Sequence, residues 1–227
     1  MSSTPKGLLF DLDGVLLNTE PLHGQAWTRT AASFGTHLNL DQLKLLQGRR
    51  RHDCARQVST WIDQSIEIDE VLKIHKPISQ ELLRKADAMP GAESLITWCY
   101  KSKFPIALVT SSNSSSVANK THHHKWLDFL SVRVQGDDPN LLNGKPAPDP
   151  YLLGAKKLNF KPEECWAIED SLSGTKSALS AGCKVFVLKN ELNQNLIASN
   201  YSNSKSNPRF INELTEILNL LKTPKRS

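Results

Sequence analysis

Short apolar runs alternate with helical patterns along most of the chain. The first run, at 7–11, is apolar on successive positions until it ends at Asp11, as expected of a strand buried on both faces of a parallel sheet. Similar runs recur at 105–109, 131–134, 165–168 and 184–188. Helical periodicity covers 92–100, 114–125, 149–158 and 174–181, and Gly182 is placed as a helix C-terminal cap. This alternation predicts an α/β fold, with a doubly wound parallel sheet.

The segment between residues 20 and 88 has a different pattern, without the alternation typical of strands. Apolar positions between 22 and 34 fall on one helical face, and Asp41 and Asp69 are candidate N-caps of two further helices. Pro77 should kink or break the second of these. We therefore expect a core domain of residues 1–18 and 89–227 and an inserted helical domain of residues 19–88. The Ser/Asn-rich stretch 190–207 is expected to be a loop.

Composition indicates an ordinary globular protein. The chain has 227 residues, 39% of them hydrophobic, and a formal net charge of +5, which suits a small anionic substrate. The positive charges are too dispersed to indicate nucleic-acid binding, and no apolar stretch is long enough to span a membrane. The four cysteines form no C-x-x-C motif, and no signal peptide is evident. A soluble, cytoplasmic monomer is the expectation.

Polar groups follow the predicted strands at the edge where parallel α/β sheets bind ligands. Because each group alone is commonplace at a protein surface, only their joint arrangement at successive strand ends indicates chemistry. The groups are Asp11 and Asp13 after the first strand, Thr110, Ser111 and Ser112 after the second, Lys145 after the third, and Glu169 and Asp170 after the fourth.

These residue types suit phosphoryl transfer. Asp11 can attack phosphorus and form an acyl phosphate, which splits one difficult step into two. Mg²⁺ takes oxygen ligands and offsets the repulsion between a carboxylate and a phosphate. We expect Asp11 and Asp170 to bind Mg²⁺ through their carboxylates and Asp13 through its backbone carbonyl. Glu169 is expected either to bind the ion or to hold a group that does.

The remaining groups at the strand ends have complementary roles. Lys145 can neutralise Asp11 and a phosphoryl oxygen. The Thr110 hydroxyl and the groups of Ser111 and Ser112 can donate hydrogen bonds to the phosphoryl oxygens. Asp13 can protonate the leaving oxygen and then deprotonate the incoming water or hydroxyl.

The four motifs together closely resemble the haloacid dehalogenase superfamily of phosphotransferases, over nearly the whole chain. They are the segments at 11–15, 109–111, 144–146 and 168–171. The strings at 145–151 and 170–174 resemble the β-phosphoglucomutase-like, or CbbY-like, branch. This resemblance implies a Rossmann-like core with a small four-helix cap inserted after the first motif.

The resemblance extends into the inserted segment. Thr19 and His23 resemble residues of the mutase's first cap helix, and Gly48 with Arg51 resembles its substrate-reading loop. By this resemblance all four are candidate substrate-binding residues. Asn18, however, stands where the mutase usually has an aspartate, and the mutase's cap lysine has no counterpart in register.

The leading hypothesis is a Mg²⁺-dependent phosphatase that hydrolyses a small phosphorylated metabolite, such as a sugar phosphate, through an aspartyl phosphate. A hexose-phosphate mutase of the β-phosphoglucomutase type is the first alternative. A dehalogenase is disfavoured because Asp13 and the metal carboxylates would then have no role. A non-catalytic binding protein on the same scaffold is disfavoured because it would be expected to have lost one of the central residues.

Overall fold

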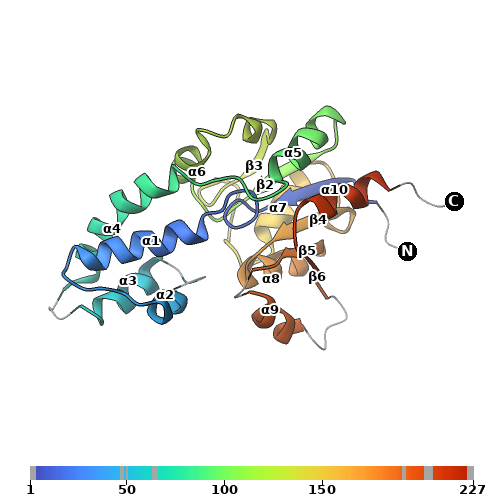
Figure 1. Ribbon diagram of the computed structural model, residues 1–227. Coiled ribbons are helices and arrows are strands. Elements are labelled where there is room, and N and C mark those ends of the chain that lie inside the picture. Colours follow the sequence, from blue (N-terminus) through green and yellow to red (C-terminus); the bar gives the residue numbers. More distant parts are fainter. Residues whose placement is uncertain are drawn as a thin grey trace. The chain divides into compact units, whose positions relative to one another are not determined.

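The computed structural model describes residues 4–46, 49, 51–62, 66–190, 193–201 and 207–223. The chain divides into two compact units, one formed by residues 1–17 with 88–227 and the other by Asn18–Asp87. The first unit carries the sheet and the second consists of helices (Figure 1). Within the described ranges, no helix combines the length and apolar character required to cross a bilayer.

The sheet has six strands, all parallel, in the order β3-β2-β1-β4-β5-β6. This order is that of doubly wound dinucleotide-binding folds, in which the chain moves outward from a central strand in both directions. The predicted α/β fold with an inserted helical segment is therefore confirmed. The strands are β1 (Gly7–Phe10), β2 (Ile106–Val109), β3 (Val132–Val134), β4 (Cys165–Glu169), β5 (Lys184–Leu188) and β6 (Arg209–Ile211).

The central strands are buried on both faces. Every residue of β1 and β2 is buried, as the continuous apolar runs in the sequence predict. Leu9 and Val109 pack in one cluster with Tyr151 and Ala155 of helix α7 (Asp149–Lys157). Leu8 and Phe10 point to the opposite face because side chains alternate along a strand. The sheet therefore needs helices on both sides.

The helices of this unit follow the strands. Helix α7 contacts β1, β2 and β3, helix α8 contacts β4 and β5, and α5 contacts α10. Two short 3₁₀ helices, Lys125–Phe129 and Pro162–Glu164, complete the unit. The α-helices are α5 (Ala92–Lys101), α6 (Ser114–Thr121), α7 (Asp149–Lys157), α8 (Leu172–Ala181), α9 (Asn193–Tyr201) and α10 (Thr215–Lys222).

Side-chain caps fix where two of the site-bearing helices begin. Asn113 accepts a hydrogen bond from the backbone N–H of Ser116 at the start of α6, at 2.9 Å. Ser171 accepts one from the N–H of Gly174 at the start of α8, at 3.0 Å. Such caps satisfy N–H groups that have no partner within the helix. Helix α8 ends at Ala181, and the capping residue Gly182 has a left-handed φ of 95°, as predicted for a glycine cap.

The inserted unit contains α1 (Glu20–Ala32), α2 (Leu40–Leu46), α3 (Arg51–Ser59) and α4 (Ile68–Leu83). Its core includes Trp27 and Ala31 of α1, Val58 of α3 and Val71 of α4. His75 of α4 is 2% exposed and stacks on Trp27, with ring centroids 3.7 Å apart. Thr30 supports the same histidine through a contact of 3.1 Å with Nδ1. This unit therefore has a hydrophobic core of its own.

Three details of the prediction are wrong. Helix α2 begins at Leu40 rather than after Asp41, because Asn39 and Gln42 exchange hydrogen bonds between side chains and backbone. Helix α4 begins at Ile68 with Glu67 in the N-cap position, so Asp69 lies in the first turn and is not the cap. Of the two outcomes expected at Pro77, a break does not occur, because the buried face of α4, which includes His75, extends past the proline. The expected loop at 190–207 contains helix α9.

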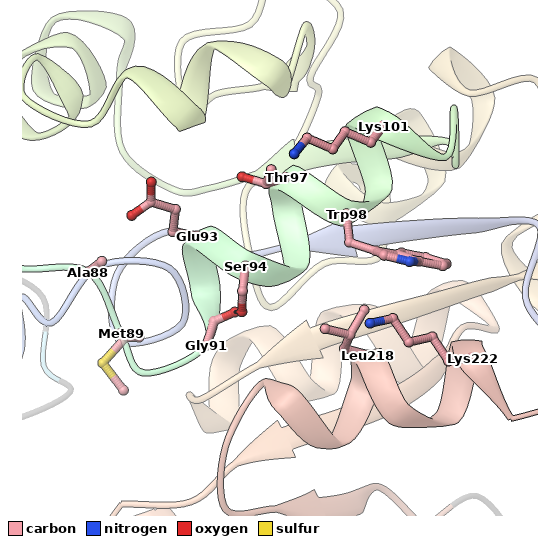
Figure 2. Close-up of a pocket in the computed structure, with 10 residues that line it drawn as sticks. All are labelled: Ala88, Met89, Gly91, Glu93, Ser94, Thr97, Trp98, Lys101, Leu218 and Lys222. Atoms are coloured by element: carbon pink, nitrogen blue, oxygen red, sulfur yellow. Dashed lines mark hydrogen bonds between the residues drawn. The ribbon is translucent and has the colours of Figure 1, made fainter.

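A groove of about 670 Å³ lies between α5 and α10. Figure 2 shows Trp98 of α5 and Lys222 of α10 beside each other there, and the ammonium of Lys222 lies 6.0 Å from the centre of a Trp98 ring. None of the predicted site residues lines this groove. The candidate chemistry therefore lies elsewhere in the unit.

Candidate active site

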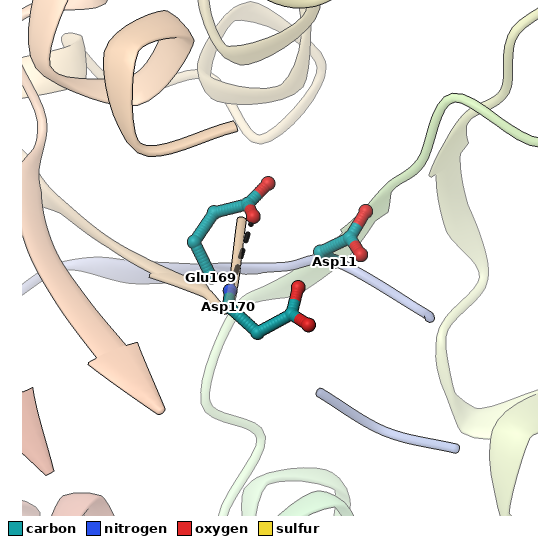
Figure 3. Close-up of side chains that lie close together, drawn as sticks. All are labelled: Asp11, Glu169 and Asp170. Carbon is teal, nitrogen blue, oxygen red and sulfur yellow. Dashed lines mark hydrogen bonds between the residues drawn. The ribbon is translucent and has the colours of Figure 1, made fainter. Parts of the chain in front are cut away.

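The strand ends bring the predicted carboxylates together. Asp11 follows β1, Glu169 ends β4 and Asp170 comes next, and these two strands are neighbours in the sheet. One carboxylate oxygen from each residue lies within 4.8 Å of the others. Figure 3 shows the three side chains converging. Among the residues that the structure describes, this is the one group of its kind, and all three members are buried.

Lys145 lies at the centre of this cluster. Its ammonium donates to Asp11 Oδ1 at 2.7 Å, to Glu169 Oε1 at 2.5 Å and to the Val109 carbonyl at 3.0 Å. The lysine side chain is 5% exposed, so water does not weaken these contacts. All three ammonium protons therefore have acceptors. Lys145 joins β1, β2 and β4 at the edge where their ends meet.

Glu169 holds Lys145 and has no free oxygen. Its Oε1 accepts from Lys145 and from the Tyr151 hydroxyl, the latter at 2.7 Å. Its Oε2 accepts from the backbone N–H groups of Asp170 and Ser171 and from the Ser171 hydroxyl. A carboxylate with five donors is saturated, so this geometry favours a supporting role over direct metal binding.

The charges in the cluster perturb one another. Burial, together with the negative charges of Glu169 and Asp13, raises the pKa of Asp11 to about 7, although Lys145 opposes this shift. Burial alone would raise the pKa of Glu169, but Lys145 and Tyr151 hold it below its ordinary value. Burial alone would lower the pKa of Lys145, yet the two carboxylates raise it. Lys145 therefore keeps the pKa of Glu169 low but does not fully offset the effect of burial on the pKa of Asp11.

The cluster fits a hard dication by its donor chemistry. Asp11 and Asp170 are each 8% exposed and offer oxygen atoms only, which Mg²⁺ prefers. Burial is the main cause of the raised pKa of Asp11, and the negative charges of Glu169 and Asp13 add to it. A bound dication would favour the ionised carboxylate.

Two glycines allow the carboxylates to sit close to the backbone. Gly14 has a left-handed φ of 78°, and a Cβ atom there would meet Asp170 Oδ2 at 2.0 Å. A Cβ atom on Gly174 would meet Glu169 Oε1 at 1.8 Å. Such separations exclude any larger residue, so both glycines are part of how the site is built.

The predicted phosphate-binding residues lie at the end of β2. Thr110 is 3% exposed and its Oγ1 accepts the N–H of Ser112 at 3.1 Å. Ser111 is exposed, and its carbonyl lies so close to Gly136 that a Cβ on that glycine would come within 2.3 Å. The loop after β3 thereby supports the loop after β2.

Asp13 pairs with a residue that was not among the predicted site residues. Lys120 of α6 donates to both carboxylate oxygens of Asp13, at 2.7 and 2.6 Å, and to Ser112 Oγ at 2.7 Å. The Ser112 hydroxyl in turn donates to Asp13 Oδ2 at 3.0 Å. The helix at α6 was predicted, but its mostly polar sequence did not indicate that Lys120 is buried. The one signal available is that Lys120 lies three residues after the buried Val117.

The predicted substrate-binding residues of the inserted unit are located here only by their surroundings in that unit. Thr19 is fully buried and its hydroxyl has no hydrogen-bond partner. His23 is half-buried on α1, and Arg51 is exposed at the first position of α3. Burial, with the charges of Arg51 and His23 adding to it, lowers the pKa of His75 to about 3. Gly48 lies outside the described residues.

Comparison with known proteins assigns the chain to a family. The model of haloacid dehalogenase-like hydrolases matches residues 8–188, which span the carboxylates, Lys145 and the inserted unit. The chain belongs to this family, and the resemblance seen in its motifs is confirmed.

Individual relatives agree with this assignment. A probable pseudouridine-5′-phosphatase of Saccharomyces cerevisiae is 35% identical over 79% of this chain and 80% of its own length. Hexitol phosphatase A of Escherichia coli is 33% identical over 81% of this chain and 82% of its own. A Thermotoga maritima structure provisionally described as a β-phosphoglucomutase superposes with a TM-score of 0.81, at 26% identity over 96% and 98% of the two chains. The chain is thus a phosphatase of the haloacid dehalogenase-like family.

Proposed function

We propose that this phosphatase hydrolyses a phosphate monoester of a sugar or a similar polyol through an aspartyl phosphate on Asp11. The observation that supports this most directly is the contact of 2.7 Å between Lys145 and the buried carboxylate of Asp11. A lysine held there by Glu169 lowers the repulsion between Asp11 and an incoming phosphate. The same contact orients Asp11 for attack.

The reaction proceeds in two displacements. In the first, a carboxylate oxygen of Asp11 attacks phosphorus, the bond from phosphorus to the ester oxygen breaks, and Asp13 gives a proton to the leaving alcohol. In the second, water attacks phosphorus, its proton passes to Asp13, and the bond from phosphorus to Asp11 breaks. Inorganic phosphate and the regenerated carboxylate are the products. Thr110 and Ser111 donate hydrogen bonds to the phosphoryl oxygens. Ser112, which was also predicted to do so, instead gives its N–H to Thr110 Oγ1 and its hydroxyl proton to Asp13 Oδ2.

Asp11, Asp170 and the backbone carbonyl of Asp13 would hold Mg²⁺. The ion, when bound, supplies charge neutralisation at the phosphoryl oxygens. Glu169 contributes by holding Lys145 and the start of α8 rather than as a ligand, because all of its acceptor capacity is engaged by the protein.

The substrate class is proposed from the relatives and the charge of the chain. The named substrates of relatives are small phosphorylated molecules such as pseudouridine 5′-phosphate, glycerol 3-phosphate and hexitol phosphates. The formal net charge of +5 is compatible with an anionic substrate of this size.

The inserted unit is proposed to act as a cap that closes over the site and excludes bulk water. Thr19, His23, Gly48 and Arg51 are its candidate substrate-binding residues. The arginine can pair with a second anionic group or hydrogen-bond to sugar hydroxyls. The prediction placed this domain at residues 19–88, and the compact helical unit is Asn18–Asp87.

A phosphosugar mutase is the second candidate, favoured by the likeness to the Thermotoga maritima structure. In that case the phosphoryl group of Asp11 would pass to a sugar hydroxyl instead of water. The two activities differ in their products. A mutase interconverts the 1- and 6-phosphates of a hexose when primed with a bisphosphate, and a phosphatase releases inorganic phosphate.

A panel of phosphorylated sugars, polyols, nucleotides and p-nitrophenyl phosphate, assayed with Mg²⁺ and with EDTA, tests the proposal. We expect Mg²⁺-dependent phosphate release that is fastest on a sugar or polyol phosphate. Primed interconversion of hexose phosphates without net phosphate release would favour the mutase. Absence of both activities would refute the proposed function.

A further inference from the structure

The buried side chain of Lys120 takes no part in the phosphoryl-transfer steps described above. It is 2% exposed, although lysine is rarely buried unless it is paired. Its three ammonium protons have three acceptors, namely both oxygens of Asp13 and the Ser112 hydroxyl. Lys120 and Asp13 are 107 positions apart in the chain, so the fold brings this pair together.

Three contacts form a closed triangle around Asp13. Lys120 contacts Asp13 and Ser112, and the Ser112 hydroxyl donates to Asp13 Oδ2. Two oxygens held by a single ammonium leave the carboxylate little freedom to rotate about its terminal bond. The triangle therefore fixes where the oxygens of Asp13 point.

The helix that carries Lys120 is itself anchored. Asn113 caps the start of α6, and Asp137, in the loop after β3, accepts from both the N–H and the hydroxyl of Ser114 at 2.8 and 2.6 Å. From that fixed start, Val117 and Lys120 are the buried residues of the helix and lie on one face because they are three positions apart. The start of the helix that carries Lys120 is thus anchored by side-chain contacts outside the catalytic cluster.

We propose that Lys120 is a positioning residue for the acid–base step, which acts by holding the carboxylate of Asp13 in line with the leaving oxygen. The proposal rests on the proposed function, since it requires the acid–base role of Asp13. Lys145 orients the residue that attacks phosphorus and Lys120 orients the residue that assists departure. The site then uses two buried lysines for two separate tasks.

The leaving group provides a readout specific to this role. General acid help matters most when the leaving oxygen is strongly basic, and least for p-nitrophenolate, which departs readily. Phenyl phosphate and p-nitrophenyl phosphate have nearly the same shape and differ in this respect. The value of kcat/KM reports on every step from substrate binding to the first irreversible step, which here is departure of the phenol. The ratio of kcat/KM for the two substrates therefore measures how much Asp13 assists that departure as a general acid.

The experiment compares Lys120→Met with Lys120→Arg, Asp13→Asn and the exposed control Lys156→Met, each with Mg²⁺ present. For Lys120→Met we expect kcat/KM to fall at least about tenfold for phenyl phosphate and no more than about threefold for p-nitrophenyl phosphate. The fall should lie in kcat rather than in KM. Lys120→Arg should recover most of the loss because it restores a paired cation, and Lys156→Met should match wild type.

A double variant tests whether the two residues act together. Because Lys120 acts through Asp13, Asp13→Asn combined with Lys120→Met should be no slower than Asp13→Asn alone. Equal losses on the two substrates, or multiplying losses in the double variant, would overturn the proposal. If Lys120→Met does not fold, Lys120→Gln, which keeps most of the side chain without its charge, is measured in the same way.

The controls separate failure of this inference from failure of the proposed function. If Asp13→Asn shows the dependence on the leaving group and Lys120→Met does not, only the role of Lys120 is overturned. If Asp13→Asn also lacks that dependence, the acid–base role of Asp13 fails, and the inference fails with it. Absence of Mg²⁺-dependent turnover by the wild-type protein would instead refute the proposed function itself.

Discussion

Tyr151→Phe removes one hydroxyl from the support of the site and leaves the ring in place. In the wild-type protein this hydroxyl donates to Glu169 Oε1 at 2.7 Å, and both residues are fully buried. A hydrogen bond to a charged group contributes about 1.5–3 kcal/mol, and no water reaches this site to replace it. We therefore expect the free energy of unfolding to fall by about 2 kcal/mol, which lowers Tm by roughly 4–8 °C in a chain of this size.

The same substitution should affect catalysis only moderately. Lys145 still contacts Glu169 Oε1 in the variant, so the lysine remains close to Asp11. Looser support of Lys145 should lower kcat by less than about tenfold, because no group in contact with the phosphate is removed. Urea and thermal unfolding, followed by tryptophan fluorescence, give the stability, and phosphate release gives kcat.

Tyr100→Phe is the matched control. Tyr100 is 57% exposed and its ring stacks on Phe129 with centroids 4.0 Å apart, a contact that phenylalanine preserves. Its loss of stability should stay below about 0.5 kcal/mol. If the two substitutions shift Tm equally, or if Tyr151→Phe causes no shift, Tyr151 does not support Glu169 as inferred.

Five further substitutions test burial, close approach and charge. Thr175→Val removes a buried hydroxyl that has no partner and should leave the free energy of unfolding unchanged or raise it by up to about 1 kcal/mol. Thr30→Val loses two contacts and should lower the free energy of unfolding by about 1–3 kcal/mol in urea. Gly174→Ala forces a Cβ onto the buried carboxylate of Glu169 and should abolish phosphate release. In the matched control Gly24→Ala, the new Cβ on helix α1 enters open space and should stabilise the fold by about 0.5–1 kcal/mol. In the folded protein the pKa of His75 is lowered to about 3, so as pH falls the imidazole is protonated in the unfolded chain before it is protonated in the folded one. The free energy of unfolding should therefore fall as pH drops from about 6.5 towards 3. His75→Gln should flatten that dependence in unfolding experiments. An equally steep dependence in the variant would show that another group is responsible.

Much of the site was predictable because the polar groups follow buried strands. Asp11, Thr110 and Glu169 stand directly at the ends of apolar runs, and parallel strands present such ends at one edge of the sheet. Lys145 could be identified only from the motif at 144–146, because the strand before it, Val132–Val134, is short and only partly buried. The positions of these residues at successive strand ends were enough to predict that their side chains lie near one another.

Contacts between distant elements were not predictable in the same way. Lys120 lies in a helix of serines and asparagine, where a lysine normally faces water, and only the tertiary fold places Asp13 against it. The five donors on Glu169 likewise depend on rotamers and loop geometry. Helix α9 was missed because most of its residues are polar, and strand β6 was missed because three residues are too few to show a periodicity.

The central claim is that Asp11 carries the phosphoryl group during turnover. Rapid acid quenching of the enzyme with a radiolabelled phosphate monoester and Mg²⁺, followed by peptide mapping, measures this directly. We predict an acid-stable, alkali-labile label on the peptide that contains Asp11, formed as the alcohol is released and absent from Asp11→Asn. Label on a different residue, or turnover of Asp11→Asn at the wild-type rate, would contradict the account.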